Sequence, residues 1–300
     1  MSLQARPKPG FFFRHGRGCF TLDLSQCTDC TNSIALKEQI SMNTPRKITH
    51  IACVASDAPK AQAARAELAE RHDLVPADQA DALVALGGDG FMLQTMHEYA
   101  GSGVPIYGMN RGTIGFLLNQ FNPDNLLERL NNAQRLALNP LVMNATTVDG
   151  RFFPAQAFNE VSLHRYNQQS ANIRVLINGR ERLDRLVCDG IMLATPAGST
   201  AYNLSARGPI IPLGANMLAL TPVCPFRPRR WNGALLPHTA VVEFEILDAK
   251  RRPVGASADS FEVRDVAHVR VVEDQSRPAS ILFDQDHSLE ERIFNEQFVH

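Results

Sequence analysis

The residues best suited to chemistry lie in four short segments, and the first is a glycine-rich loop around one carboxylate. This loop, Gly87-Gly88-Asp89-Gly90, follows an apolar run at residues 81–86. Glycines let a backbone approach a phosphate closely and present its N–H groups to it. The carboxylate of Asp89 would repel a phosphate, so it is better suited to accept a proton or hydrogen bond from an attacking hydroxyl, or to help hold a metal ion. A plain β-turn rich in Asp and Gly has the same composition.

A second segment, Asn110-Arg111-Gly112, follows another apolar run at residues 104–109 and continues to Leu117. In open α/β sheets, ligands bind beyond the carboxyl ends of the strands. The segment should therefore lie on the same sheet edge as the first loop, where Arg111 could meet phosphate charge. A simple connection with an exposed arginine is the plainer interpretation of this segment taken alone.

The third segment is the dipeptide Asn159-Glu160, which closes the run 152–158. A carboxylate can accept hydrogen bonds from both hydroxyls of a ribose, and an amide can pair with the edge of an adenine. A polar strand end facing solvent would look the same, so the dipeptide is weak evidence by itself.

The fourth segment, residues 188–205, is the most informative, because small residues and hydroxyls gather around an expected helix start. Such a start offers free N–H groups and the positive end of the helix dipole. Within it, Tyr202 could stack on a flat ring and Asp189 could accept from an amide or amine. A capped helix with structural Ser and Thr is the alternative, but the density of small polar residues favours a binding site.

These segments need elements to position them, and from Arg46 the chain alternates short apolar runs with helix-forming stretches. Strands are expected at 48–55, 81–86 and 104–109, and helices at 59–72 and 91–99. A further helix is expected at 122–131, with Asn122 as its cap and Pro123 at its first position. This alternation predicts a parallel sheet with both faces covered.

After about Leu136 the pattern changes to short strands separated by turns. Asp149-Gly150 and Asn178-Gly179 lie between strand-like runs and predict tight hairpins. Further strands are expected at 241–247 and 269–272, and short helices at 195–206 and 288–298. This half of the chain therefore predicts an antiparallel sandwich.

The predicted organisation is an α/β domain at 42–135, joined by the C-terminal segment 286–300, and a β-sandwich domain at 136–285. Residues 1–41 show no sustained periodicity. They are expected to form a poorly structured arm, or to be sequence upstream of a natural start at Met42.

Composition places the chain among ordinary globular proteins and argues against several classes of partner. It has 300 residues, 44% hydrophobic and 20% charged, with a formal net charge of −1. No wide basic face for nucleic acid or an anionic membrane is expected, and no apolar run approaches the roughly 20 residues of a membrane span. The 6 cysteines are too sparse for a disulfide scaffold, which favours buried thiols and a cytoplasmic location.

Several common catalytic motifs are absent from the sequence. There is no P-loop, no complete G-x-G-x-x-G, no H-E-x-x-H and no G-x-S-x-G. Cys27-Thr28-Asp29-Cys30 lacks a second Cys or His pair at zinc spacing. This C-x-x-C is therefore interpreted as incidental, and no dedicated metal site built from the protein's own side chains is expected.

The four segments, in this order in an α/β-then-β chain, resemble the NAD kinase family over roughly residues 46–300. The Gly-Gly-Asp-Gly loop is also similar to that of diacylglycerol kinases and 6-phosphofructokinases, but only NAD kinases add the other three. The resemblance implies a Rossmann-like α/β domain of that type with a parallel sheet, plus an antiparallel all-β sandwich. It also implies transfer of a phosphate to the adenosine ribose 2′-hydroxyl of NAD, which gives NADP.

The resemblance implies roles by position, with Asp89 as the general base or orienting acceptor. The implied NAD-binding residues are Gly90, Phe116, Asn159, Glu160, Asp189, Ala197, Thr200, Ala201, Tyr202, Asn203 and Ser205. The implied phosphate- or ATP-binding residues are Gly87, Gly88, Asn110, Arg111 and Gly112.

The family also implies ATP with a divalent metal, Mg²⁺, or inorganic polyphosphate as the donor, and assembly into homodimers or homotetramers. Two residues depart from the common pattern, since Phe91 and Ala197 stand where members often have Thr. The donor is therefore left open. Two other functions are also open: a non-catalytic NAD(P) sensor, and a related lipid or sugar kinase.

Overall fold

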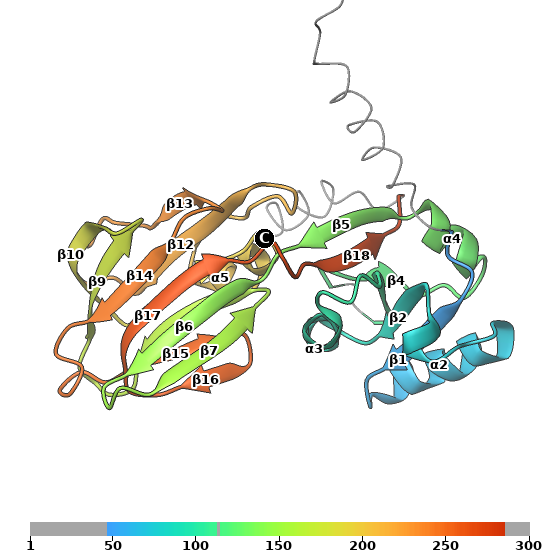
Figure 1. Ribbon diagram of the computed structural model, residues 1–300, viewed down its shortest axis with the longest axis horizontal. Coiled ribbons are helices and arrows are strands. Elements are labelled where there is room, and N and C mark those ends of the chain that lie inside the picture. The colour runs from blue at the N-terminus through green and yellow to red at the C-terminus, as the bar shows by residue number, and fades with distance from the viewer. Residues whose placement is uncertain (1–46, 113–114, 286–300) are drawn as a thin grey trace, which may run out of the picture. The chain divides into compact units, whose positions relative to one another are not determined.

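The computed structural model describes residues 47–112 and 115–285, and its first sheet is mostly parallel (Figure 1). Three parallel neighbours lie in chain order, and a strand from near the end of the described chain pairs parallel with the third of them. An antiparallel strand then closes that edge. The strands are β1 (Ile51–Ala55), β2 (Ala82–Leu86), β3 (Ile106–Asn110), β18 (Ala279–Phe283) and β5 (Gln134–Leu138), with the short β4 (Asn119–Gln120) beside β3.

Helices cover both faces of this sheet, as the continuous apolar runs predicted. Successive residues of a strand point to opposite faces, and along β2 Leu83 belongs to one buried cluster and Val84 to the other. The first cluster includes residues of α3 (Asp89–Tyr99), whereas the second includes residues of α2 (Pro59–Arg71) and α4 (Leu126–Asn132). The 3₁₀ turn η1 (Ala77–Gln79) precedes β2.

The predicted start of the third helix was wrong by several residues. The side-chain oxygen of Asn122 accepts the Asp124 N–H at 2.9 Å, so this asparagine forms a local turn instead of capping the helix. Asn125 then takes a left-handed φ of 52°, and α4 begins only at Leu126.

The second half of the described chain forms two antiparallel sheets whose inner faces share one apolar cluster. This is the predicted sandwich, and each sheet has six strands. The first sheet runs β10 (Arg180–Cys188), β9 (Ala171–Ile177), β14 (Val242–Ile246), β17 (Val266–Glu273), β6 (Leu141–Thr147) and β7 (Phe152–Ala157). The second runs β13 (Ala234–Pro237), β12 (Met217–Val223), β11 (Gly190–Ala194), β8 (Glu160–Arg165), β15 (Val254–Ala258) and β16 (Phe261–Val263).

Turn-forming dipeptides correctly predicted two hairpins in this half of the chain. Asp149-Gly150 joins β6 to β7, and Asn178-Gly179 joins β9 to β10. Asn178 and Gly179 both have positive φ values, 53° and 71°, as the tight hairpin with that dipeptide requires. The predicted short helix at 195–206 is present as η2 (Gly198–Thr200) followed by α5 (Tyr202–Ser205).

The structure differs from the predicted domain limits at two strands. The expected β domain, 136–285, contains β18 and most of β5, yet both pair in the parallel sheet. In Figure 1 the red β18 accordingly lies beside the green β5. A strand's own residues do not show which sheet it joins, because pairing is set by partners distant in sequence. The predicted arm (1–41), C-terminal segment (286–300) and final helix (288–298) lie outside the described residues.

No helix within the described ranges is both long and apolar enough to cross a membrane. Three of the six cysteines are described, and Cys53, Cys188 and Cys224 are all free thiols. Burial raises the pKa of the Cys53 thiol to about 11, so that thiol stays protonated near neutral pH.

Candidate active site

Asp89 is the first residue of α3, immediately after the two glycines that follow β2. Its carboxylate accepts the backbone N–H groups of Phe116 at 3.3 Å and Leu117 at 3.4 Å. These donors and the positive end of an 11-residue helix both stabilise negative charge at this position. The first and second segments therefore meet, as their places after neighbouring strands predicted.

Gly115 allows this meeting because the Asp89 carboxylate occupies the space where a side chain would stand. A Cβ added to Gly115 would lie 2.1 Å from Asp89 Oδ1, far inside contact distance. Gly115 is thus required because the Asp89 carboxylate closely approaches its backbone. The sequence alone showed only that this segment is rich in glycine.

A hollow of about 440 Å³ opens in front of Asp89 and is walled by residues of all four segments. Its volume lies in the range of small-molecule pockets. The wall combines the helix start, the loop after β3, the corner between β7 and β8, and the η2 turn. The lining residues are Asp89, Gly90, Leu93, Gly115, Phe116, Leu117, Asn159, Ala197, Thr200 and Ala201.

The third and fourth segments are bound together by backbone contacts. Thr195 donates its hydroxyl to the Phe158 carbonyl at 2.6 Å, and its N–H to the Asn159 carbonyl at 2.9 Å. Gly198 packs so tightly here that an added Cβ would lie 2.1 Å from the Asn159 carbonyl oxygen. The η2 turn therefore brings Ala197 and Thr200 against the corner that carries Asn159.

Glu160 begins β8, and its environment is unfavourable for a charge. Burial, reinforced by the nearby Asp259 carboxylate, raises the pKa of Glu160 from 4.5 to about 7. Its Oε2 atom is buried and has no hydrogen-bond partner in the described part of the chain. An unsatisfied buried oxygen of this type is suited to a ligand hydroxyl.

Tyr202 and Ser205 line a second hollow of about 600 Å³. Tyr202 directly follows Ala201, which lines the first hollow. Tyr202 is 37% exposed, and its ring lies 5.6 Å from the His164 ring, centroid to centroid. Asp189 forms an ion pair with Arg165, with 2.5 Å between Oδ1 and Nε.

Several predicted residues do not reach either hollow. Asn203 is fully buried, and its side chain bonds to the Ser199 and Pro209 carbonyls and to the Thr221 hydroxyl. Its amide therefore holds the turn together. Arg111 forms an ion pair with Glu67 and stacks over Phe121. The other predicted residues that line neither hollow are Gly87, Gly88, Asn110, Gly112, Glu160 and Asp189.

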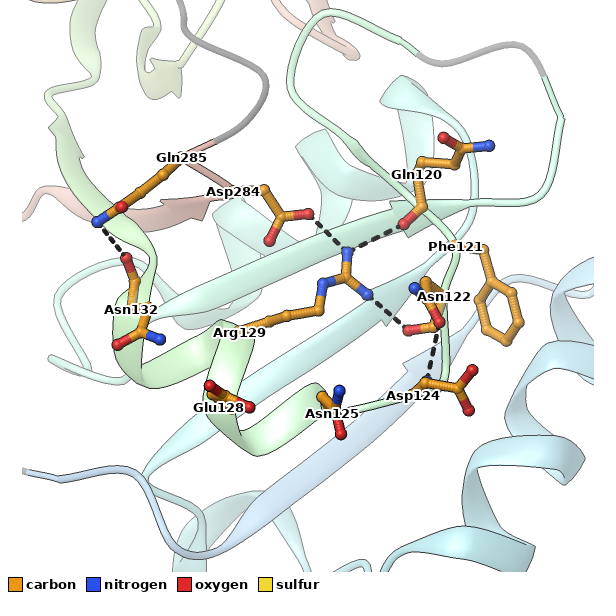
Figure 2. A pocket seen from close by; sticks show the side chains of 10 residues that line it. All are labelled: Gln120, Phe121, Asn122, Asp124, Asn125, Glu128, Arg129, Asn132, Asp284 and Gln285. Carbon is orange, nitrogen blue, oxygen red and sulfur yellow. Dashed lines mark hydrogen bonds and ion pairs between the residues drawn. The ribbon is translucent and has the colours of Figure 1, made fainter.

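A larger hollow, about 670 Å³, lies elsewhere, around Arg129 (Figure 2). Arg129 already pairs with Asp284 at 2.6 Å and donates to the Asn122 carbonyl, also at 2.6 Å. Three carboxylates, those of Asp124, Glu128 and Asp284, line this hollow. Its charge is thus unsuited to a phosphate, and the smaller hollow at Asp89 is the better candidate.

The donor set at Asp89 suits a metal ion that arrives with a substrate. Mg²⁺ is usually held by one or two carboxylates together with substrate phosphates and waters. Asp89 is the single carboxylate among the described residues that line its hollow. Within the described ranges, no group of three or more His, Cys, Asp or Glu could hold a metal by itself.

The fold and this site define a class: a nucleotide-binding phosphotransferase that acts on a hydroxyl. The α/β half provides a glycine-rich strand-to-helix loop with one carboxylate, and the β half closes the hollow in front of it.

Comparison with known proteins specifies the class further. The family model described as the ATP-NAD kinase N-terminal domain matches residues 27–135, and that of the ATP-NAD kinase C-terminal domain matches residues 158–243. The NAD kinase of Caulobacter vibrioides is 55% identical over 251 residues, 84% of this chain and 96% of that protein. The NAD kinase of Rhizobium meliloti is 53% identical over 84% of this chain and 98% of that protein. The chain belongs to the NAD kinase family, whose members are phosphotransferases acting on an alcohol group.

Solved structures support the fold independently of close sequence similarity. Yeast NADH kinase in complex with NADH matches with a TM-score of 0.71 at 21% identity, over 85% of this chain and 88% of that chain. An NAD kinase from Archaeoglobus fulgidus in complex with ATP matches with a TM-score of 0.62 at 22% identity, over 82% and 96%.

Proposed function

We propose that the hollow at Asp89 binds the adenosine ribose of NAD and that Asp89 orients its 2′-hydroxyl for attack on the donor phosphate. The observation that carries this proposal is the single hollow that unites Asp89 with Asn159 and the η2 turn. A carboxylate at one end and an amide at the other suit a nucleoside with a hydroxyl and a base edge to be recognised.

The remaining NAD contacts are proposed from the walls of the two hollows and from Glu160, which directly follows the lining residue Asn159. Asn159 and Glu160 would bind the adenine and ribose portions, and the unsatisfied Oε2 of Glu160 supports this assignment. Tyr202 and Ser205 would contact the rest of the dinucleotide in the second hollow. Consecutive residues, Ala201 and Tyr202, line the first and the second hollow, which supports contact of one dinucleotide with both.

The chemistry proposed is in-line phosphoryl transfer. Its transition state is loose, so positioning and charge neutralisation matter more than full deprotonation of the hydroxyl. Asp89 would accept the hydrogen bond and later the proton of the 2′-hydroxyl. Mg²⁺ bound with ATP would neutralise phosphate charge, with Asp89 as the protein carboxylate nearest to it in this donor set.

ATP is the proposed donor, and polyphosphate is the alternative. The Phe91 side chain packs over Gly87, because an added Cβ there would lie 2.7 Å from Phe91 Cβ. Phe91 also packs against the core cluster beneath α3. In place of the Thr hydroxyl that the family resemblance implies here, Phe91 provides an apolar cover, which leaves backbone N–H groups of the loop to meet the donor phosphates.

Assembly and location complete the proposal: a homodimer or homotetramer in the cytoplasm. Two large apolar side chains, Met217 and Leu235, are 36% and 48% exposed on the neighbouring strands β12 and β13. The three described cysteines are free thiols, as expected in a reducing compartment.

The test is NADP formation by the purified protein with NAD, ATP and Mg²⁺, and with polyphosphate in a parallel reaction. Product with ATP alone supports the proposed donor, and product with both shows a relaxed donor site. Measurable NAD binding without product from either donor would contradict the proposed chemistry at Asp89.

A further inference from the structure

Asp259 lies outside all four segments, yet it organises the third. It stands in the turn between β15 and β16 with a left-handed φ of 48°. Its carboxylate accepts the backbone N–H groups of Phe158 at 2.7 Å, Asn159 at 3.0 Å and Glu160 at 3.3 Å. Three consecutive donors on one carboxylate fix the backbone of the corner from which the Asn159 and Glu160 side chains emerge.

His97 provides the fourth contact to this carboxylate. Its Nε2 lies 2.7 Å from Asp259 Oδ2, while the Asp259 side chain is 1% exposed. A buried carboxylate needs full compensation of its charge, so the imidazole N–H is a required partner. His97 also packs edge-on against the Phe158 ring, with 5.1 Å between centroids and 73° between planes.

The same helix carries His97 and Asp89, since α3 begins at Asp89 and includes His97 in its last turn. A helix is a rigid spacer. The contact from His97 to Asp259 therefore relates the position of the Asp89 carboxylate to that of the Asn159–Glu160 corner. The proposed reaction depends on the relative position of these two parts of the site.

We propose that His97 is a positioning residue that acts through Asp259 to hold the Asn159–Glu160 corner at a set distance from Asp89, and so determines the affinity for the NAD substrate. This inference rests on the proposed function, because it takes the corner to be part of the NAD site. His97 itself does not touch the reacting atoms.

The experiment compares His97→Phe, which keeps a ring against Phe158 but removes the N–H donor, with His97→Gln, whose amide can replace it. Loss of one hydrogen bond to a buried charge predicts a rise of about tenfold in the KM for NAD in His97→Phe. The kcat and the KM for ATP should stay within about twofold. His97→Gln should restore most of the NAD affinity.

His268→Phe is the matched control. His268 pairs with Glu243 at 3.2 Å between strands β17 and β14, away from the hollow, and its side chain is 36% exposed against 32% for His97. The control should leave the KM for NAD unchanged. An equal rise in the control would show general destabilisation, and equal rises in His97→Phe and His97→Gln would show that the effect does not depend on a side-chain donor at position 97; either result would overturn the proposal.

Hydrogen exchange of the ligand-free protein separates this inference from the proposed function. The amides of residues 158–160 should exchange faster in His97→Phe than in the wild type or the control. Unchanged exchange would overturn the positioning role. Faster exchange with an unchanged KM would also overturn it, and would locate the failure in the assignment of the corner to the NAD site.

A double-mutant cycle with Asp259→Asn provides a second criterion. If His97 acts through Asp259, the double variant should bind NAD no worse than Asp259→Asn alone. Additive losses would show that His97 acts by another route and would contradict the proposal.

Discussion

Asp89 lines the proposed NAD hollow, Glu160 directly follows the lining residue Asn159, and the surroundings of these two carboxylates are opposite. Asp89 heads a helix and accepts two backbone N–H groups, both of which stabilise a negative charge. Glu160 is buried beside another carboxylate, and one of its oxygens has no partner in the described chain. The comparison teaches that local surroundings set the charge of each carboxylate: helix start and backbone donors favour the ionised form of Asp89, whereas burial and a neighbouring carboxylate favour the protonated form of Glu160.

The largest expected effect comes from removing the charge at Asp89. Asp89→Asn keeps the shape of the side chain and should lower kcat by about 10²–10⁴-fold, because the 2′-hydroxyl loses its proton acceptor. NAD affinity should change little, since the corner and the η2 turn are intact. Steady-state NADP formation and equilibrium NAD binding measure the two quantities, and a near-normal kcat would exclude the proposed role of Asp89.

A second test displaces the corner that carries the other carboxylate. Gly198→Ala puts a methyl group into the Asn159 carbonyl, at 2.1 Å before relaxation. Overpacking of this type costs about 1–3 kcal/mol, and the shifted corner should raise the KM for NAD by about tenfold. Thermal unfolding and kinetics measure both effects.

Gly214→Ala is the control for that substitution, because no atom lies within 4 Å of its added Cβ. It should leave the KM for NAD and the stability close to those of the wild type. Equal losses of stability and of NAD affinity in both variants would show that crowding against the Asn159 carbonyl is not the cause of the effect.

The pH dependence of stability tests the surroundings of Glu160. Its folded pKa, about 7, is above the ordinary 4.5, so the folded state binds this proton more tightly than the unfolded state. The free energy of unfolding should therefore fall as pH rises from 4.5 to 7. Glu160→Gln cannot ionise, so its stability advantage over the wild type should grow over that interval to at most about 3 kcal/mol.

Chemical denaturation of both proteins at pH 5 and pH 8 measures this difference. A constant difference at the two pH values would contradict the raised pKa. The same variant should bind NAD more weakly at pH 8, where the wild-type carboxylate is ionised and accepts ribose hydroxyls.

The smallest expected effect is at the second hollow. Tyr202→Ala removes a half-exposed ring and should raise the KM for NAD by about threefold to tenfold, in keeping with the modest energy of an aromatic contact. Tyr202→Phe keeps the ring and should behave like the wild type. Equal losses in both variants would assign the contribution to the hydroxyl, and no loss in either would remove Tyr202 from the site.

Sequence patterns predicted the local parts of this protein well. The alternation of buried runs and helices predicted the parallel sheet, and Asn178-Gly179 predicted its hairpin, since both signals reside in neighbouring residues. The Gly-Gly-Asp-Gly loop predicted a carboxylate between a strand and a helix, and the helix begins at Asp89, two residues before its expected start at Phe91. The predicted helix start at Asn122 was wrong because an asparagine side chain can either cap a helix or form a local turn.

Tertiary contacts decided the rest. Nothing near Asp259 in the sequence indicates that it binds the backbone of residues 158–160, and His97 looked like any polar residue on a helix. Arg111 is equally suited by sequence to a phosphate or a carboxylate, and packing placed Glu67 beside it. The sequence by itself determined the four segments and their order, because close backbone approach and helix starts require particular residues. Only the folded chain decided which side chains face the hollow and which support it, because those contacts join residues that are far apart along the chain.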